Sequence, residues 1–215
     1  MASAKNKNPA RRGVLAMGLG LGALTLLGGL PALAANVAET FVDENIRKGL
    51  DILNNKSLPA DQRRSQFEGF LLGLTDMKRI ADFTLGQYRR GLSPNDLAAF
   101  DVAFQNYAVA VYQSYFAKYA GQTLKVTGSQ TRAADDFIVS TALIDPNDHS
   151  GQPPLEVDFR VRTDTGKPIV TDFSVEGIWL ALEERDQFTS FLGQNGGNIA
   201  SLDSHLNDLA KQYRG

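Results

Sequence analysis

The chain has no cysteine among its 215 residues and only two histidines, His149 and His205. The lack of thiols excludes disulfides, cysteine-ligated zinc, iron–sulfur clusters and thiol catalysis. A nucleophilic triad needs a histidine base, and we interpret both histidines as surface residues, His149 in a polar loop and His205 on the last helix. The sequence also has no Gly-x-Ser-x-Gly motif and no phosphate-binding loop. It therefore predicts no catalytic residue, no metal site and no cofactor.

A predominance of one charge is lacking too, because 22 Lys and Arg residues stand against 24 Asp and Glu residues. There is no basic stripe, which argues against nucleic acid as a partner. Carboxylates are paired at 135–136 and 183–184. Adjacent side chains point apart on a helix or a strand, so we expect solvated faces here and not acid–base dyads. The remaining composition, with 43% hydrophobic residues, is ordinary for a globular protein.

The first 34 residues contain no acidic side chain. Four basic residues at positions 5–12 precede an apolar run at 14–30, and small residues flank Leu33. This pattern is typical of a secretory signal peptide that is cleaved after Ala34. We therefore predict a signal peptide at 1–34, a single domain at 35–215, and a periplasmic protein. The paired arginines at 11–12 also fit a loose twin-arginine motif, but the pattern favours the Sec route.

Helices are predicted for the first part of the mature chain. Apolar residues recur near helical spacing at 37–53 and again at 67–74, after Pro59. Asp76 is expected to cap a third helix that ends near Tyr88. The segment Ser93-Pro94-Asn95-Asp96 has a cap, a proline at the first helical position and an acidic residue at the third. It predicts a long helix that reaches about Ala120.

After Gly121 the apolar period changes from 3.6 to 2. Strands are predicted from 124 and over 137–143, 155–162 and 169–175, with a turn at 164–167 and a bulge at Gly177. In the third strand the charged residues are expected to face water; they are Glu156, Asp158, Arg160 and Arg162. Further helices are predicted at 185–192 and after Asn198. Helices, then an antiparallel sheet, then helices indicate an α+β fold whose sheet curves against the long helix.

The long helix carries seven aromatic residues between 100 and 119, on two adjoining stripes. They are typical of solid core, and they are also suited to one wall of a cavity between the helix and a curved sheet. Composition does not separate these two interpretations.

An ordered set of short motifs runs along the mature chain. Early ones are Leu85-Gly86-Gln87-Tyr88, Ser93-Pro94 at a helix start, and Tyr119-Ala120-Gly121-Gln122-Thr123. Later ones are Ile144-Asp145-Pro146, the segment 153–159, the segment 172–178, and Arg185-Asp186-Gln187-Phe188. Together they resemble the MlaC, or toluene-tolerance, family of periplasmic phospholipid-binding proteins, and the resemblance covers nearly the whole mature chain in the same order.

The resemblance implies a nuclear-transport-factor-2-like fold, with helices around a curved antiparallel sheet that enclose a deep apolar pocket. It implies a non-enzymatic shuttle that carries phospholipid between an outer-membrane lipoprotein–porin complex and an inner-membrane ABC transporter with an MCE-domain protein. Such a shuttle maintains the lipid asymmetry of the outer membrane. A hopanoid-associated carrier is an alternative. So are an isomerase or hydratase with Asp82 or Tyr107 as its acid–base group, and a module that binds only protein.

The expected pocket wall consists of residues on the apolar stripes that face each other in this architecture. These lipid-binding residues are Phe83, Tyr88, Phe104, Tyr107, Val111, Tyr115, Phe159, Val161, Phe173, Val175, Ile178 and Trp179.

Overall fold

The computed structural model describes residues 29–116 and 119–214. The predicted signal peptide therefore lies largely outside the described residues. Within the described ranges, no helix combines the length and the apolar character that crossing a membrane requires. The helical elements are α1 (Gly29–Asn54), α2 (Ala60–Leu74), α3 (Met77–Thr84), the 3₁₀ helix η1 (Gly86–Gly91), α4 (Pro94–Phe116), α5 (Leu180–Gln194) and α6 (Ile199–Arg214).

Helix starts follow the local signals in the sequence. The Asp76 side chain accepts a hydrogen bond from the backbone N–H of Arg79 at 3.0 Å and caps α3. At the start of α4, the Ser93 and Asp96 side chains each accept a hydrogen bond from the other's backbone N–H, both at 3.2 Å. This reciprocal pair satisfies two N–H groups that the first helical turn leaves free.

Helix α3 is shorter than the sequence predicted. It ends at Thr84, and Gly86 follows with a φ of +53°, a conformation that suits a residue without a Cβ. The chain then continues as η1 up to Gly91, so Tyr88 lies on a 3₁₀ turn and not on the α-helix.

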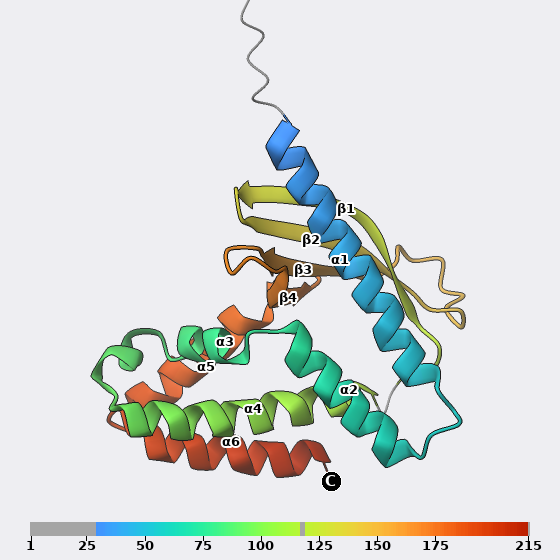
Figure 1. Ribbon diagram of the computed structural model, residues 1–215. Helices are drawn as coiled ribbons and strands as arrows, with labels where there is room; N and C mark the ends of the chain where they lie inside the picture. The colour runs from blue at the N-terminus through green and yellow to red at the C-terminus, as the bar shows by residue number, and fades with distance from the viewer. Residues whose placement is uncertain (1–28, 117–118, 215) are drawn as a thin grey trace, which may run out of the picture.

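One five-stranded sheet has the order β1-β2-β3-β4-β5, and every neighbouring pair is antiparallel. Register shifts occur twice between β1 and β2 and once between β3 and β4. Such bulges bend a strand, and β1 is visibly curved (Figure 1). The strands are β1 (Thr123–Ala133), β2 (Asp136–Ile144), β3 (Glu156–Arg162), β4 (Ile169–Val175) and β5 (Ile178–Trp179).

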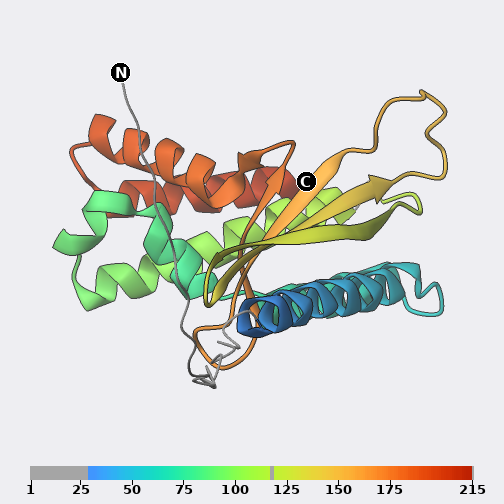
Figure 2. The ribbon, with the colours of Figure 1, turned by 90° about the horizontal axis from the view of Figure 1, so that it is seen from above.

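Two apolar clusters hold the elements together. Helix α1 crosses one face of the sheet, whereas α4 and α6 lie side by side below it (Figure 1). Seen from above, α1 and the pair α5 and α6 lie toward opposite sides (Figure 2). The first cluster joins α3, α4, α5 and α6 around Phe100, Phe188 and Leu206. The second joins α1 to the sheet around Val42 and Val139. The predicted α+β class is thus confirmed.

The charged face of β3 is exposed as the sequence predicted only at Glu156; its other three charged residues are buried or half-buried. Asp158 is buried and accepts a hydrogen bond from the Ser174 hydroxyl at 3.2 Å. Arg160 donates two hydrogen bonds to the buried carboxylate of Asp136, at 3.0 and 2.8 Å. Arg162 lies 3.5 Å from the same carboxylate. Burial by itself would raise the pKa of Asp136, but its pKa is lowered because these two guanidinium groups favour the charged form.

The end of the sheet also differs from the expectation. Gly177 does not form a bulge inside a strand; with Glu176 it makes the turn from β4 to β5, at φ values of +79° and +53°. Helix α5 then begins at Leu180, five residues before its predicted start, directly after Trp179.

Candidate functional site

A cavity of about 260 Å³ lies between α1, α2 and the sheet. Its wall is almost wholly apolar. The lining residues are Phe41, Val42, Asn45, Ile46, Gly49, Leu50 and Leu53 from α1; Phe67, Phe70, Leu71 and Leu74 from α2; Tyr119 and Gln122 before the sheet; and Thr123, Leu124, Leu143, Phe159 and Val170 from the strands. We call this space the main cavity.

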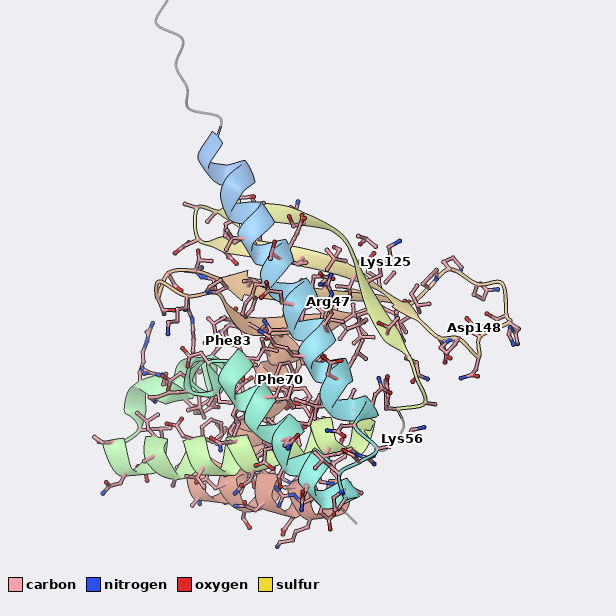
Figure 3. The ribbon with its side chains drawn as sticks, turned by 45° about the vertical axis from the view of Figure 1, so that its right-hand side comes forward. Arg47, Lys56, Phe70, Phe83, Lys125 and Asp148 are labelled. Carbon is pink, nitrogen blue, oxygen red and sulfur yellow. The ribbon has the colours of Figure 1, made fainter. Side chains whose placement is uncertain are left out.

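Helical periodicity directs these side chains inward. On α1 the lining positions recur at intervals of three and four residues, which places them on one face of the helix. At Gly49 the absence of a side chain matters, because a Cβ there would lie 3.2 Å from the Phe70 ring. The glycine thus lets the α2 aromatics approach α1. Figure 3 shows Phe70 on α2, near the point where this helix passes α1.

One end of the main cavity is polar. The Tyr119 hydroxyl accepts a hydrogen bond from the Asn54 side chain at 3.1 Å. The Gln122 amide donates to Asp145 at 3.0 Å, at the base of the loop between β2 and β3. This loop projects from the sheet, as the position of Asp148 shows (Figure 3). The apolar interior therefore ends in a rim of neutral and acidic side chains at this side.

A second, smaller cavity of about 60 Å³ shares Val170 with the main one. It lies between α4, β4 and the start of α5, and it contains two carboxylates. Glu184 accepts a hydrogen bond from the Tyr107 hydroxyl at 2.7 Å, and burial raises its pKa despite this bond. Burial also raises the pKa of Asp172, which accepts hydrogen bonds from the backbone N–H groups of Phe173 and Ala181.

These contacts correct the expectation that the carboxylates at 183–184 and 135–136 are simply solvated. Glu184 accepts a hydrogen bond from Tyr107, and Asp136 is buried beside Arg160 and Arg162. Arg162 also pairs with Asp135, at 3.1 Å.

A third hollow, of about 230 Å³, is polar and lies next to the second. Arg79, Arg160 and Arg162 line it together with Phe83. Each guanidinium is already bound to carboxylates, since Arg79 pairs with Asp164 and the other two with Asp136. The carboxylates around this hollow thus offset the charge of its cations.

The structure separates the twelve expected pocket residues into groups. Phe159 lines the main cavity; Phe104, Tyr107, Val111 and Phe173 line the second; Phe83 lines the third and lies under the Arg185 guanidinium. Among the described residues, five line none of these three spaces. They are Tyr88, Val161, Val175, Trp179 and Ile178. Tyr88 packs on the first apolar cluster, Val161 is fully buried in the second apolar cluster, and Ile178 is 58% exposed. The side chain of Tyr115 lies outside the described part of the chain.

The residues that sequence reasoning missed are those of α1 and α2. Their helical apolar spacing was visible, but it is the same signal that a helix packed on solid core produces. The acid–base candidate Asp82 lies outside the three cavities. It is paired with Arg89 and Lys78, and the hydrogen bond from Arg89 lowers its pKa.

Comparison with known proteins adds two findings. A family model described as "MlaC protein" matches residues 43–210 of the chain. The fold is also similar to a solved structure of a phospholipid-binding protein from Ralstonia solanacearum in complex with a phospholipid, with a TM-score of 0.67 and 20% sequence identity. That similarity covers 85% of this chain and 99% of the Ralstonia chain.

Proposed function

The chain belongs to the MlaC family, and from this premise we propose that it binds a phospholipid in the main cavity and carries it through the periplasm. The observation that supports this most is the cavity itself, about 260 Å³ of space enclosed by aliphatic and aromatic side chains. The Ralstonia protein of similar fold was solved with a phospholipid bound. The structural similarity to this protein supports the fold alone, because the sequence identity is only 20%. The apolar wall of the cavity supports the ligand class.

A protein that carries lipid through water needs an apolar cavity for a physical reason. Burying one methylene group away from water is worth about 0.8 kcal/mol, so two acyl chains with some 30 methylenes represent on the order of 20 kcal/mol. A lipid with its chains exposed could not cross an aqueous compartment at a useful rate. Transfer from a bilayer into an apolar cavity exchanges one apolar setting for another, so the carrier needs no nucleotide.

We place the acyl chains against Phe159 and the α1 and α2 residues of the main cavity. The space beyond Val170, lined by Phe104, Tyr107, Val111 and Phe173, would be an extension of it. Residues 1–34 would direct export. The proposed route runs between an outer-membrane lipoprotein–porin complex and an inner-membrane ABC transporter with an MCE-domain protein, in support of outer-membrane lipid asymmetry.

An enzymatic role has less support. The second cavity holds the acid–base groups Glu184 and Asp172, but its volume is about 60 Å³. A cavity of about 150 Å³ is needed to hold one benzene ring. The space therefore suits one or two waters and not a substrate.

The direct test is native mass spectrometry of protein purified from the periplasm, followed by identification of any released lipid. We expect a bound species with the mass of a phospholipid. Protein that carries none, and takes none from vesicles of phosphatidylethanolamine and phosphatidylglycerol, would refute the proposal. A bound hopanoid would support the alternative carrier of the same family.

A further inference from the structure

The main cavity is too small for the ligand that we assign to it. A cavity of about 150 Å³ holds the six carbons of benzene. In the same proportion, the 260 Å³ seen here accommodates about ten carbons, whereas two acyl chains carry about 30 methylenes. Both acyl chains can therefore be fully enclosed only if part of the wall moves outward.

Helix α2 is the part of the wall with the weakest attachment. All of its residues belong to the described part, and none of them is buried. By contrast, α1, α3, α4, α5 and α6 each contribute buried side chains to a cluster. Phe67, Phe70, Leu71 and Leu74 of α2 line the cavity, so part of each side chain faces space and gives up fewer contacts than in a filled core when the helix moves.

Polar contacts hold α2 only lightly. Gln113 on α4 donates a hydrogen bond to Glu68 at 3.2 Å, and Arg63 reaches the backbone carbonyl of Asn55 at 3.5 Å. Hydrogen bonds of this part-buried, side-chain type contribute on the order of 1 kcal/mol each. Breaking both is therefore compatible with repeated opening.

The two ends of α2 differ in how firmly they are anchored. At its N-terminal end the helix begins after Pro59 with no side-chain cap, beyond the short turn 55–58. At its C-terminal end Thr75 is extended and forms a parallel bridge with Val170 of β4. The Asp76 cap then fixes α3. This geometry suits a pivot near Thr75, with the N-terminal end of α2 as the moving end.

We propose that α2 is the hinged wall of the lipid cavity and that it swings about Thr75, away from α1 and the sheet, to admit and release the ligand. This inference rests on the proposed phospholipid carriage. Opening displaces Phe67 most and Leu74, which is next to the pivot, least, so the main cavity widens toward the N-terminal end of α2.

The absence of native cysteine makes a locking experiment direct. In Glu68→Cys/Gln113→Cys the two introduced thiols are the only ones in the chain, at positions whose side-chain ends lie 3.2 Å apart. A short, reducible bis-thiosulfonate reagent bridges them and ties α2 to α4. The matched control is Glu183→Cys/Gln187→Cys, on the exposed side of α5, where the native side-chain ends lie 3.0 Å apart. Both proteins are mixed with vesicles that contain radiolabelled phosphatidylethanolamine.

We expect the α2 bridge to slow lipid uptake by about tenfold or more, a barrier rise of about 1.4 kcal/mol, and reduction of the bridge to restore the rate. Lipid loaded before bridging should be retained when empty acceptor vesicles are added. Uptake at the unbridged rate would overturn the hinged wall. Equal slowing in the α5 control would overturn it too, because the effect would then come from the reagent.

A lipid-independent measurement separates this inference from the proposed function. In wild-type protein the amides of α2 should exchange with deuterium faster than those of α4 and α6. A 15-residue helix that leaves its packing surface loses the tertiary support for its own hydrogen bonds and frays. Equal protection of α2 overturns the hinge. Fast exchange in α2, in a protein that takes up no lipid even when unbridged, upholds a mobile α2 and refutes phospholipid carriage.

Discussion

Leu143→Trp should fill the main cavity and displace the lipid without damaging the fold. Leu143 lies on β2 and lines the cavity opposite Leu124 of β1. Tryptophan adds roughly six heavy atoms, about one benzene ring, and a cavity of about 150 Å³ accommodates such a ring. The new side chain therefore takes up a substantial part of the 260 Å³. Because the indole enters a void, we expect the free energy of unfolding without lipid to change by less than about 1 kcal/mol.

Val161→Trp is the contrasting variant. Val161 is fully buried between α1 and the sheet and lines none of the cavities in the described ranges. The same new side chain there should overpack the core and lower the free energy of unfolding by about 1–3 kcal/mol or more. Lys125→Trp, on the exposed side of β1 beside Leu124, is the surface control.

The assay measures bound phospholipid per protein and the melting temperature with and without lipid. A ligand at 100 times its Kd stabilises the folded state by about 2.7 kcal/mol, which corresponds to roughly 5–10 °C for a domain of this size. The control should show this rise and Leu143→Trp should lose most of it. If Leu143→Trp binds lipid as the control does, the main cavity is not the lipid site. If the free energy of unfolding of Leu143→Trp instead falls as much as that of Val161→Trp, the wall at Leu143 is solid core.

Two further predictions concern buried carboxylates. Burial, with a smaller contribution from the nearby Asp96, raises the pKa of Asp203 to about 6. The folded state then binds the proton more tightly than the unfolded chain, so stability should fall as the pH rises from about 4 to 6. Asp203→Asn should abolish that fall in stability, which is worth about 1 kcal/mol after solvent screening. Urea titrations across this pH range measure it. If the free energy of unfolding of the variant depends on pH as in the wild type, Asp203 is not the group responsible. Tyr107→Phe removes the hydroxyl that donates to Glu184 and should lower the free energy of unfolding at pH 7 by about 1–3 kcal/mol. Adding Glu184→Gln should recover part of this loss, and a Tyr107→Phe protein with an unaltered melting temperature would show that the bond contributes nothing.

Features that depend on neighbours in the chain were predictable. Asp76 and Ser93 cap the helices that they were expected to cap. Asn198 accepts a hydrogen bond from the backbone N–H of Ser201 at the start of α6. Gly166 takes a φ of +83° in the expected turn. In every case the interacting groups lie within three residues, so the sequence contains both partners of the interaction.

The charged face of β3 was not predictable from its own strand. The alternation of 155–162 correctly separates two faces, but it does not show what covers each face. The register between β2 and β3 brings the carboxylate of Asp136 to Arg160 and Arg162. A carboxylate buried with two guanidinium groups is energetically tolerable, whereas the same residue alone would have to face water.

The contribution of α1 and α2 to the main cavity was not predictable for a similar reason. The aromatic stripes of α4 were compatible with solid core and with a cavity wall, and both occur. Phe100 and Phe104 each meet Phe188 of α5 edge-on at 6.3 Å, and Phe104 also lines the second cavity. The larger space lies behind α1 and α2, whose sequences carry an ordinary amphipathic signal. A stripe of apolar residues on a helix indicates that this face is shielded from water. It does not indicate whether the element opposite packs against the stripe or leaves a cavity.

The sequence by itself determined the α+β class, the order of helices and strands, the positions of most helix starts and turns, and the family, because each of these is encoded in local spacing or in ordered motifs along the chain. Only the tertiary structure decided which apolar faces close on one another and which remain apart, where the charged strand finds its partners, and which helix is left without a buried residue. Those outcomes depend on distances between segments far apart in the sequence. Whether side chains fill a space or leave a cavity is determined only when all the surrounding elements are in place.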